Sequence, residues 1–185
     1  MIIAVSGTPG IGKTSATKEL KKILDFNTIS IKSLVARQKI PSAYDKKRDT
    51  KIISIRDLKK GARKEVKKDR INVIEGHLAH LLDADLVIIL RCRPDVLEGR
   101  MKNKGWKTGK ISENIQSEIL DVITAEALEN NKRVKVLEID TTYKNPEQIA
   151  VTIKKILNSY GRQKKYIAGK IDWSEKYASY LINKK

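Results

Sequence analysis

Cysteine, phenylalanine, histidine and proline are scarce in this chain of 185 residues, which has one Cys, one Phe, two His and four Pro. Because Cys92 has no partner within the chain, an internal disulfide scaffold and a zinc site built from cysteines are excluded. No stretch approaches the roughly 18 uninterrupted apolar residues of a membrane-spanning helix. The chain opens on an apolar run at residues 1–5 rather than on a basic segment before a long apolar one. We therefore expect a cytoplasmic, soluble protein with no membrane partner.

Acidic residues are also few, since 22 Asp and Glu face 39 Lys and Arg and leave a formal net charge of +17. The excess is uneven: residues 1–50 carry +6, 51–110 carry +8 and 161–185 carry +5, whereas 111–160 carry −2. Residues 51–70 are the densest run, with nine basic side chains. Two interpretations stay open for this run, a solvated helix face or a surface that binds RNA or phosphate.

The end of the chain combines positive charge with aromatic rings. Five of the nine aromatic residues lie there among lysines and an arginine, namely Tyr160, Tyr166, Trp173, Tyr177 and Tyr180. Aromatic rings interleaved with cations suit base stacking and phosphate contact. The alternative is that the tail folds back and buries its rings against the domain.

Apolar, β-rich runs alternate with helical patterns along the chain. The expected strands are 1–6, 26–31, 71–74, 86–90 and 134–139, and the expected helices are 13–24, 55–68, 95–104, 112–130 and 146–159. This alternation predicts one α/β domain, a five-stranded parallel sheet with helices on both faces. Two irregular insertions, 30–53 and 103–113, are expected to be functional flaps.

Residues 7–14 read Gly-Thr-Pro-Gly-Ile-Gly-Lys-Thr, which matches G-x-x-x-x-G-K-[ST] in full. The motif follows an expected strand and runs into an expected helix, as a phosphate-binding loop requires. Gly10 and Gly12 allow the backbone to curl around phosphate oxygens, and amides at the helix start face the anion. Lys13 is expected to reach the β- and γ-phosphates of ATP, and the Thr14 hydroxyl to ligate Mg²⁺.

A carboxylate and a histidine follow the third expected strand. Glu75 stands where the second acid of a magnesium site is expected in such proteins, reaching the metal through water. His77 could place an attacking water or a phosphate, although a single histidine is more often an ordinary hydrogen-bonding residue. Glu75, His77 and His80 could also bind a transition metal, but the phosphate loop already accounts for a hard cation with oxygen ligands.

The chain resembles the adenylate kinase-like ATPases of small-subunit ribosome biogenesis, in particular their archaeal members. The resemblance covers nearly all of residues 1–160. It rests on the 7–14 loop and on Tyr44-Asp45, Arg48-Asp49, Glu75-Gly76-His77, Val87-Ile88-Ile89-Leu90-Arg91, Val96-Leu97, Arg100, Gly105-Trp106 and the run 113–122.

The resemblance implies a P-loop nucleoside monophosphate kinase fold over residues 1–160. It also implies an NMP-binding insertion at 30–53 and a lid at 103–113. The basic aromatic C-terminal tail at 161–185 lies outside the resemblance. The implied ATP contacts are Gly10, Gly12, Lys13, Thr14, Ser15 and Lys104. The implied AMP contacts are Arg37, Tyr44 and Arg48. The implied catalytic residues are Lys13, Glu75 and His77, with Mg²⁺ held by Thr14 and Glu75.

The implied activity is transfer of the γ-phosphoryl group of ATP to AMP, giving two ADP, with associated ATPase activity. A role in small-subunit assembly and rRNA maturation is implied as well, with a platform ribosomal protein as partner and rRNA as a further candidate. One alternative is a nucleotide-switched assembly ATPase whose kinase activity is incidental. A third possibility is a nucleic-acid-binding module that uses ATP only as a ligand.

Three departures from the family pattern bear on these expectations. The family's strand-end Asp is Glu75 here, and its lid Arg is Lys104, which keeps the charge but loses the planar fork of a guanidinium. An acid near the start of the NMP segment is Ser33, and Arg37 is displaced by one position. AMP recognition is therefore the expectation that the sequence supports least.

Overall fold

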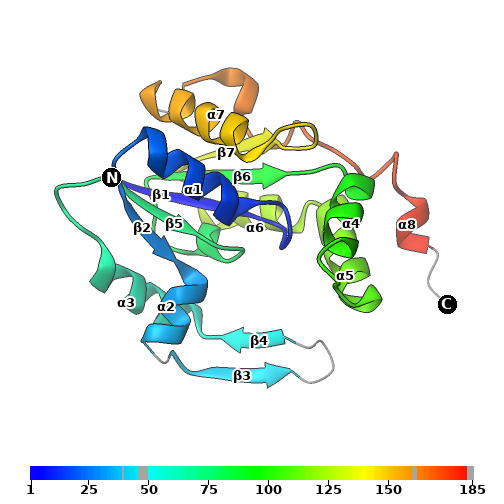
Figure 1. The fold of residues 1–185 in the computed structure, drawn as a ribbon, viewed down its shortest axis with the longest axis horizontal. Coiled ribbons are helices and arrows are strands. Elements are labelled where there is room, and N and C mark those ends of the chain that lie inside the picture. Colours follow the sequence, from blue (N-terminus) through cyan, green and yellow to red (C-terminus); the bar gives the residue numbers. More distant parts are fainter. Residues whose placement is uncertain (39, 46–49, 160–161, 183–185) are drawn as a thin grey trace.

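The central feature of the fold is a sheet of five parallel strands in the order β2-β5-β1-β6-β7 (Figure 1). The structure is a computed structural model and describes residues 1–38, 40–45, 50–159 and 162–182. The strands are β1 Ile2–Gly7, β2 Asn27–Ser30, β5 Asn72–Glu75, β6 Leu86–Arg91 and β7 Lys135–Asp140. In the register of the sheet, Val5 lies opposite Glu75 on one side and Ile88 on the other. The expected parallel sheet is confirmed, with strand ends within two residues of those expected.

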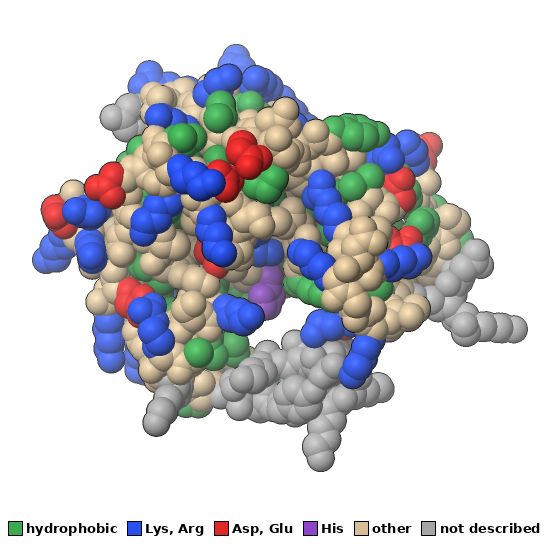
Figure 2. Space-filling model, viewed as in Figure 1, with side chains coloured by type: hydrophobic (Ala, Val, Ile, Leu, Met, Phe, Trp, Pro, Cys, Tyr) green, Lys and Arg blue, Asp and Glu red, His purple; other side chains and the backbone are tan. Residues whose placement is uncertain are grey.

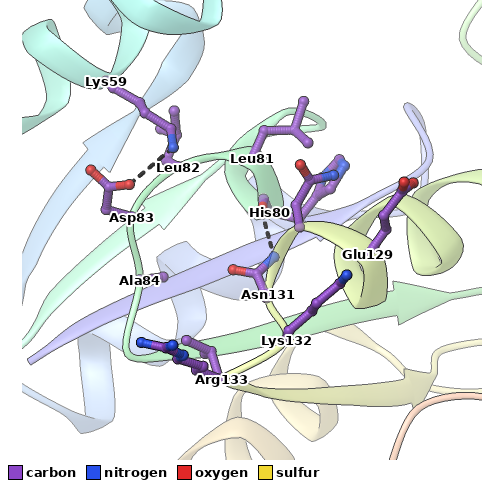
Figure 3. A pocket seen from close by; sticks show the side chains of 12 residues that line it. Lys59, His80, Leu81, Leu82, Asp83, Ala84, Glu129, Asn131, Lys132 and Arg133 are labelled. Atoms are coloured by element: carbon purple, nitrogen blue, oxygen red, sulfur yellow. Dashed lines mark hydrogen bonds and ion pairs between the residues drawn. The ribbon is translucent and has the colours of Figure 1, made fainter.

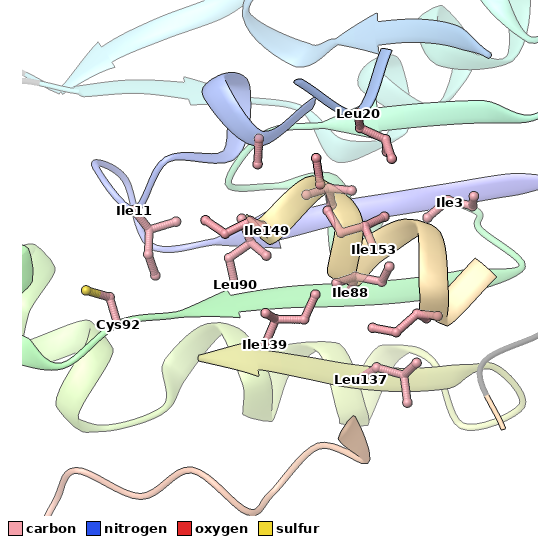
Figure 4. Close-up of a cluster of buried hydrophobic side chains, with 14 of the residues drawn as sticks. Ile3, Ile11, Leu20, Ile88, Leu90, Cys92, Leu137, Ile139, Ile149 and Ile153 are labelled. Atoms are coloured by element: carbon pink, nitrogen blue, oxygen red, sulfur yellow. The ribbon is translucent and has the colours of Figure 1, made fainter. Parts of the chain in front are cut away.

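One face of the sheet is covered by α1 (Lys13–Ile23) and α7 (Pro146–Asn158), which pack against each other. Alternate strand residues such as Ile3, Ile88 and Ile139 point into this layer, where side chains of α7 meet them (Figure 4). Asn145 caps α7 in a reciprocal capping box with Gln148, which satisfies two backbone donors at the helix start.

The other strand residues face a second apolar layer. That layer is formed by α2 (Ile31–Arg37), α3 (Ile55–Glu65), α6 (Val122–Asn130) and the short 3₁₀ helix η1 (Ala79–Leu81). Since consecutive side chains of a strand point to opposite faces, the near-continuous apolar runs of β1 and β6 are what a sheet covered on both sides requires.

The expected single helix over 112–130 is wrong, because the chain forms two helices there, α5 (Thr108–Ile119) and α6. Asp121 separates them with a φ of 53°, a left-handed conformation that costs a residue other than glycine roughly 1–2 kcal/mol. Its carboxylate bonds Arg91, whose side chain is only 2% exposed. This contact with a buried guanidinium overrides the helical pattern of the local sequence.

The two insertions are more ordered than their polar sequences indicated. The first contains α2 and an antiparallel hairpin of β3 (Ser42–Asp45) and β4 (Thr50–Ile53). In the second, α4 (Pro94–Lys102) ends, a turn with Gly105 at φ 69° follows, and α5 begins within the expected lid. Both insertions lie beyond the carboxyl ends of the strands, on either side of β1 (Figure 1).

The tail folds back onto the domain. After the short 3₁₀ helix η2 (Lys164–Tyr166), Ile167 forms an antiparallel bridge with Leu137 of the edge strand β7, and the tail then continues to α8 (Ser179–Ile182). Tyr177 is 8% exposed and joins the core cluster, and its hydroxyl donates to Asp95 of α4 at 2.9 Å. Four of the five tail aromatics therefore pack on the domain, while Tyr160 lies outside the described residues.

Within the described ranges, no helix combines the length and apolar character needed to cross a bilayer.

Candidate active site

The phosphate loop joins β1 to α1 at the carboxyl edge of the sheet. Gly10 and Gly12 have φ values of 89° and 105°, which a side chain would make costly. The first turn of α1 follows directly, so amides at its N-terminus are directed at the loop's interior. The loop thus has the conformation that its glycines predicted.

Lys13 lies folded into the loop with 9% of its surface exposed. Its ammonium donates to the carbonyl oxygens of Gly7 at 2.7 Å and Thr8 at 3.0 Å. Burial lowers the pKa of Lys13 to about 8, against the opposing effect of the carboxylates of Glu75 and Glu118. At neutral pH the group is therefore largely a cation, placed where an anion would bind.

Glu75 ends β5 beside the loop and is 5% exposed. The Thr14 hydroxyl donates to its carboxylate at 3.0 Å, so the two expected metal ligands are neighbours in space although 61 residues apart in sequence. A hydroxyl and a carboxylate are the oxygen donors that Mg²⁺ prefers. The residues present therefore fit a hard divalent cation.

His77 stands at the wall of the same cleft, two residues after Glu75. Desolvation in the cleft, together with the charge of Lys13, lowers the pKa of His77 to about 4. The imidazole is thus neutral at pH 7, so one ring nitrogen can accept a proton. Its own carbonyl accepts a hydrogen bond from the Ser6 hydroxyl at 3.0 Å, which fixes the turn. The third residue of the considered transition-metal set, His80, turns away and contacts Ser6 and Glu126 instead.

A cleft of about 1300 Å³ opens in front of these residues. In the space-filling view, a histidine is visible in a hollow, and Lys and Arg side chains lie above it and on both sides (Figure 2). One half is the phosphate-loop half, which includes Pro9, Gly10, Lys13, Thr14 and Glu75. The other is the acceptor half, lined by Ser30, Ile31, Lys32, Ser33, Val35, Ala36, Ile40, Pro41 and Ile53, and His77 and Trp106 complete the wall.

The expected AMP contacts are not brought together by the described residues. Arg37 points away from the cleft and forms an ion pair with Glu65, in which its guanidinium donates to the two carboxylate oxygens at 3.1 and 2.8 Å. Tyr44 lies in β3, whose side chains fall outside the described set, and Arg48 lies outside the described residues. In the part of the chain that the structure describes, Lys32 is the one cation that lines the acceptor half.

Two of the expected ATP contacts, Ser15 and Lys104, are exposed and are not among the residues that line the cleft. Lys104 is nevertheless near enough for its charge to lower the pKa of Lys13. Arg100 lies closer to the loop, donating to the carbonyls of Thr141 at 2.9 Å and Ile11 at 3.5 Å. Arg100 thereby ties α4 to the phosphate loop.

Sequence reasoning missed one group that touches the loop. Glu118 of α5 is 2% exposed and accepts a hydrogen bond from the Thr8 hydroxyl. The two residues are 110 positions apart, so no local pattern indicates the contact. An acidic residue on the apolar side of a predicted helix was the one available signal.

Two further hollows differ from the cleft in position. One, of about 830 Å³, lies behind the wall formed by Pro9, His77 and Trp106 and is bordered by α5 and α6. The other, of about 460 Å³, holds Lys59, Asp83 and the loop before β7 (Figure 3). It lies at the amino ends of β6 and β7, the edge of a parallel sheet that does not ordinarily bind ligands.

Comparison with known proteins finds a matching family profile and similar archaeal proteins. A protein-family profile described as "AAA domain" matches residues 3–121. A protein of Methanocaldococcus jannaschii named "Putative adenylate kinase" is 38% identical over 181 residues, covering 98% of this chain and 97% of its own. A protein of the same name from Thermococcus onnurineus is 41% identical over 177 residues, covering 96% and 93%.

Solved structures share the fold at low sequence identity. The shikimate kinase from Acinetobacter baumannii in complex with shikimate has a TM-score of 0.61 at 14% identity, covering 88% of this chain and 95% of its own. The enzyme from Bacteroides thetaiotaomicron has a TM-score of 0.53 at 15% identity, covering 86% and 98%. These similarities establish a P-loop kinase fold.

Proposed function

Because the chain belongs to the nucleoside monophosphate kinase-like family of these archaeal relatives, we propose that it is an adenylate kinase. In this proposal the γ-phosphoryl group of ATP passes to AMP in the cleft between the phosphate loop and α2, and two ADP leave. The phosphate-loop half binds the donor, and the acceptor half binds the monophosphate. The family and the kinase fold support this assignment, while the choice of AMP rests on the names of the relatives and on the sequence resemblance.

The phosphate-loop half supplies positive charge where the transition state is most anionic. The Lys13 ammonium donates to two loop carbonyls, and it can leave them and turn toward the β- and γ-phosphate oxygens when ATP binds. The loop amides can donate to the same phosphate oxygens. Thr14 and Glu75 would hold Mg²⁺, which when bound neutralises phosphate charge. His77, neutral at pH 7, can accept a hydrogen bond from the attacking group or from a water molecule near it.

The acceptor half has the character of a nucleobase site. Apolar side chains of Ile31, Val35 and Ile53 line it and can cover the face of a base, and Lys32 can pair with a phosphate. Gly76 closes the floor against Ile31, where a Cβ atom would lie 2.8 Å from the Ile31 side chain. A larger residue at position 76 would therefore displace Ile31 and with it the start of α2.

The observation that carries the proposal is the contact of Thr14 with Glu75 beside the folded Lys13, at the point where the acceptor half begins. ADP and inorganic phosphate should be measured with ATP alone and with ATP plus AMP. Transfer to AMP gives two ADP for each ATP and no phosphate, whereas hydrolysis gives one of each. We expect AMP to raise ADP formation without phosphate release. ADP formation that AMP does not raise, with one phosphate released for each ADP in both reactions, would contradict kinase activity.

A second candidate function is a nucleotide-switched ATPase in small-subunit assembly, which binds a platform ribosomal protein or rRNA. The observation that favours it is an exposed row of cations along α3 and just beyond it. The row consists of Arg56, Lys60, Lys64, Lys67 and Lys68. In contrast to Lys59 and Arg63, which pair with Asp83, these cations have no ion-pair partner among the described residues.

A variant in which two cations of this row are replaced by glutamate distinguishes the adenylate kinase from the assembly ATPase. RNA binding should be measured against salt concentration for the natural chain and for Lys60→Glu/Lys64→Glu, because each lost phosphate contact flattens the salt dependence. The assembly function predicts that the variant loses RNA affinity at least about tenfold while AMP phosphorylation is unchanged. Negligible RNA binding by both proteins, with no effect of RNA on ATP turnover, would leave adenylate kinase as the function.

A further inference from the structure

Behind the phosphate loop lies a buried network of charges that the proposed chemistry does not use. Arg91, at the end of β6, bonds Glu118 of α5 at 2.9 Å and Glu138 of β7 at 2.6 Å, and also bonds Asp121. The side chains of Arg91, Glu118 and Glu138 are each 2% exposed. Buried ion pairs of this kind are often no more stabilising than apolar side chains of the same size. Stability alone therefore does not account for this network, whose further contacts lead to the phosphate loop and to the tail.

On one side the network reaches the loop itself. One oxygen of Glu118 accepts from Arg91 and, at 3.0 Å, from the backbone N–H of Cys92. The other oxygen accepts from the Thr8 hydroxyl, which is buried in the loop. Thr8 in turn offers its carbonyl to the Lys13 ammonium. A single side-chain hydrogen bond thus links the network to the peptide unit that holds Lys13.

On the other side the network reaches the tail. Glu138 accepts from the backbone N–H groups of Gly169 at 2.8 Å and Lys170 at 3.3 Å. Arg91 also donates to the carbonyl of Ile171 at 3.4 Å. The tail therefore supplies hydrogen bonds that the buried Glu138 needs, and these bonds hold the partner of Arg91 in place.

We propose that Glu118, held by Arg91 and Glu138, is a positioning residue that fixes the phosphate loop through the hydroxyl of Thr8. The inference rests on the proposed function only in taking this loop as the ATP site. Phosphoryl transfer needs loop amides and Lys13 to converge on the same oxygens, and displacements of about 1 Å can cost roughly a hundredfold in rate. Glu118 touches no substrate in this account and acts through Thr8.

Replacement of threonine by valine tests the link, because the two side chains have the same shape and only the hydroxyl is lost. Thr8→Val removes the bond to Glu118. Thr17→Val is the matched control, since Thr17 is also buried, at 3% exposure, next to the loop on α1. Its hydroxyl has no hydrogen-bond partner within the part of the chain that the structure describes. Thr8→Ser keeps the hydroxyl and serves as the rescue variant.

Four quantities should be measured for each variant, namely kcat, the KM for ATP, the Kd of a fluorescent ATP analogue, and the melting temperature. We expect Thr8→Val to lower kcat about tenfold, whereas Thr17→Val should leave kcat nearly unchanged. The Tm of Thr8→Val should also lie below that of Thr17→Val, because one buried oxygen of Glu118 loses its hydrogen-bond partner. Thr8→Ser should recover to within about threefold of the natural chain. Equal kcat values for Thr8→Val and Thr17→Val would overturn the proposal, and so would failure of Thr8→Ser to rescue activity.

A double-mutant cycle with Glu138→Gln tests whether the network acts as one unit. If Thr8 and Glu138 act along the same chain of contacts, the loss in the double variant is smaller than the product of the two single losses. Losses that multiply would overturn the link to Glu138. The analogue Kd needs no acceptor, so it still tests the role of Thr8 if the natural chain fails to phosphorylate AMP, a failure that would count against the proposed function alone.

Discussion

The two halves of the cleft are built in different ways. In the phosphate-loop half, the functional groups are already hydrogen-bonded: Lys13 to two carbonyls, Thr14 to Glu75, and Thr8 to Glu118. All of these side chains except that of Thr14 are buried. In the acceptor half, the lining is mainly apolar, and Lys32 at its rim is exposed to solvent. One half presents prearranged charges, and the other presents shape and apolar surface.

This difference indicates how the work of the site is divided. A transferring phosphoryl group carries several charges, so groups that meet it must be fixed before it arrives. A base has flat faces that apolar side chains can cover without a fixed hydrogen-bond pattern. We therefore expect substitutions in the phosphate-loop half to lower the rate of every reaction of the protein, and those in the acceptor half to change mainly the affinity for the acceptor.

The largest effect should come from Lys13→Ala. Loss of the ammonium should lower kcat by about 10²–10³, the loss commonly produced by removing one preorganised hydrogen-bond donor. Kinase and ATPase turnover should fall together. Lys18→Ala, on an exposed position of the same helix, is the control and should retain full activity. Retained turnover in the Lys13 variant would remove the phosphate loop from the mechanism.

The next largest effect should come from Glu75→Gln. The amide keeps the size of the side chain but loses the charge that supports a divalent cation, so about 10–100 times more Mg²⁺ should be needed for half-maximal activity. Titration of activity with MgCl₂ measures this shift. Glu75→Asp, which keeps the carboxylate on a shorter arm, should lie between the natural chain and Glu75→Gln. An unchanged Mg²⁺ requirement would show that Glu75 does not support the metal.

A matched pair on α2 tests the acceptor half. Lys32→Ala should raise the KM for AMP about tenfold with kcat nearly unchanged, because one charge-assisted bond to the acceptor phosphate is lost, worth about 1.5 kcal/mol. Arg37→Ala should change that KM less than about twofold, since its guanidinium is occupied by Glu65 on the exposed side of the helix. The reverse order of effects would mean that Arg37 leaves Glu65 and binds AMP.

The smallest effect concerns folding stability between pH 7 and pH 5. Burial lowers the pKa of His80, whose side chain is 1% exposed, with Glu126 opposing the shift. The pKa of His77 is lowered as well, but this residue is exposed, so solvent screening reduces its contribution to stability. In the unfolded chain the pKa of a histidine is about 6.5. As the pH falls below that value, the unfolded chain therefore binds more protons than the folded chain, and the free energy of unfolding decreases. We expect Tm to fall by roughly 2–4 °C, the shift produced by about 1 kcal/mol in a chain of this size.

A variant without one of the two histidines provides the control for this effect. His80→Gln should show a smaller difference in Tm between the two pH values than the natural chain, whatever its absolute stability. Thermal denaturation followed by circular dichroism measures both. An equal Tm at pH 7 and pH 5 in the natural chain would contradict the lowered pKa values.

The phosphate loop, the parallel sheet and the position of Glu75 could be predicted because each depends on a local sequence pattern. Glycines and a lysine at fixed spacing define the loop, and apolar runs define strands whose carboxyl ends meet at one edge. Gly12 lies in the loop, Thr14 at the start of α1 and Glu75 at the end of β5, as the local pattern indicated, while their roles in binding stay predictions.

The acceptor half and the helix break could not be predicted because they depend on contacts between distant residues. Arg37 is turned away by Glu65, 28 residues later, and the break at Asp121 depends on Arg91, 30 residues earlier. The link between Thr8 and Glu118 spans 110 residues. Such pairs can be recognised only once the fold brings them together.

The most direct test of the division between the two halves is a crystal structure with a bisubstrate analogue, two adenosines joined by a chain of phosphates. We predict that its phosphates lie along residues 9–14 with Lys13 turned toward them, and that one adenine lies between Ile31, Val35 and Ile53. A structure in which that adenosine is bound behind Trp106 or outside the cleft, with the acceptor half empty, would contradict the account.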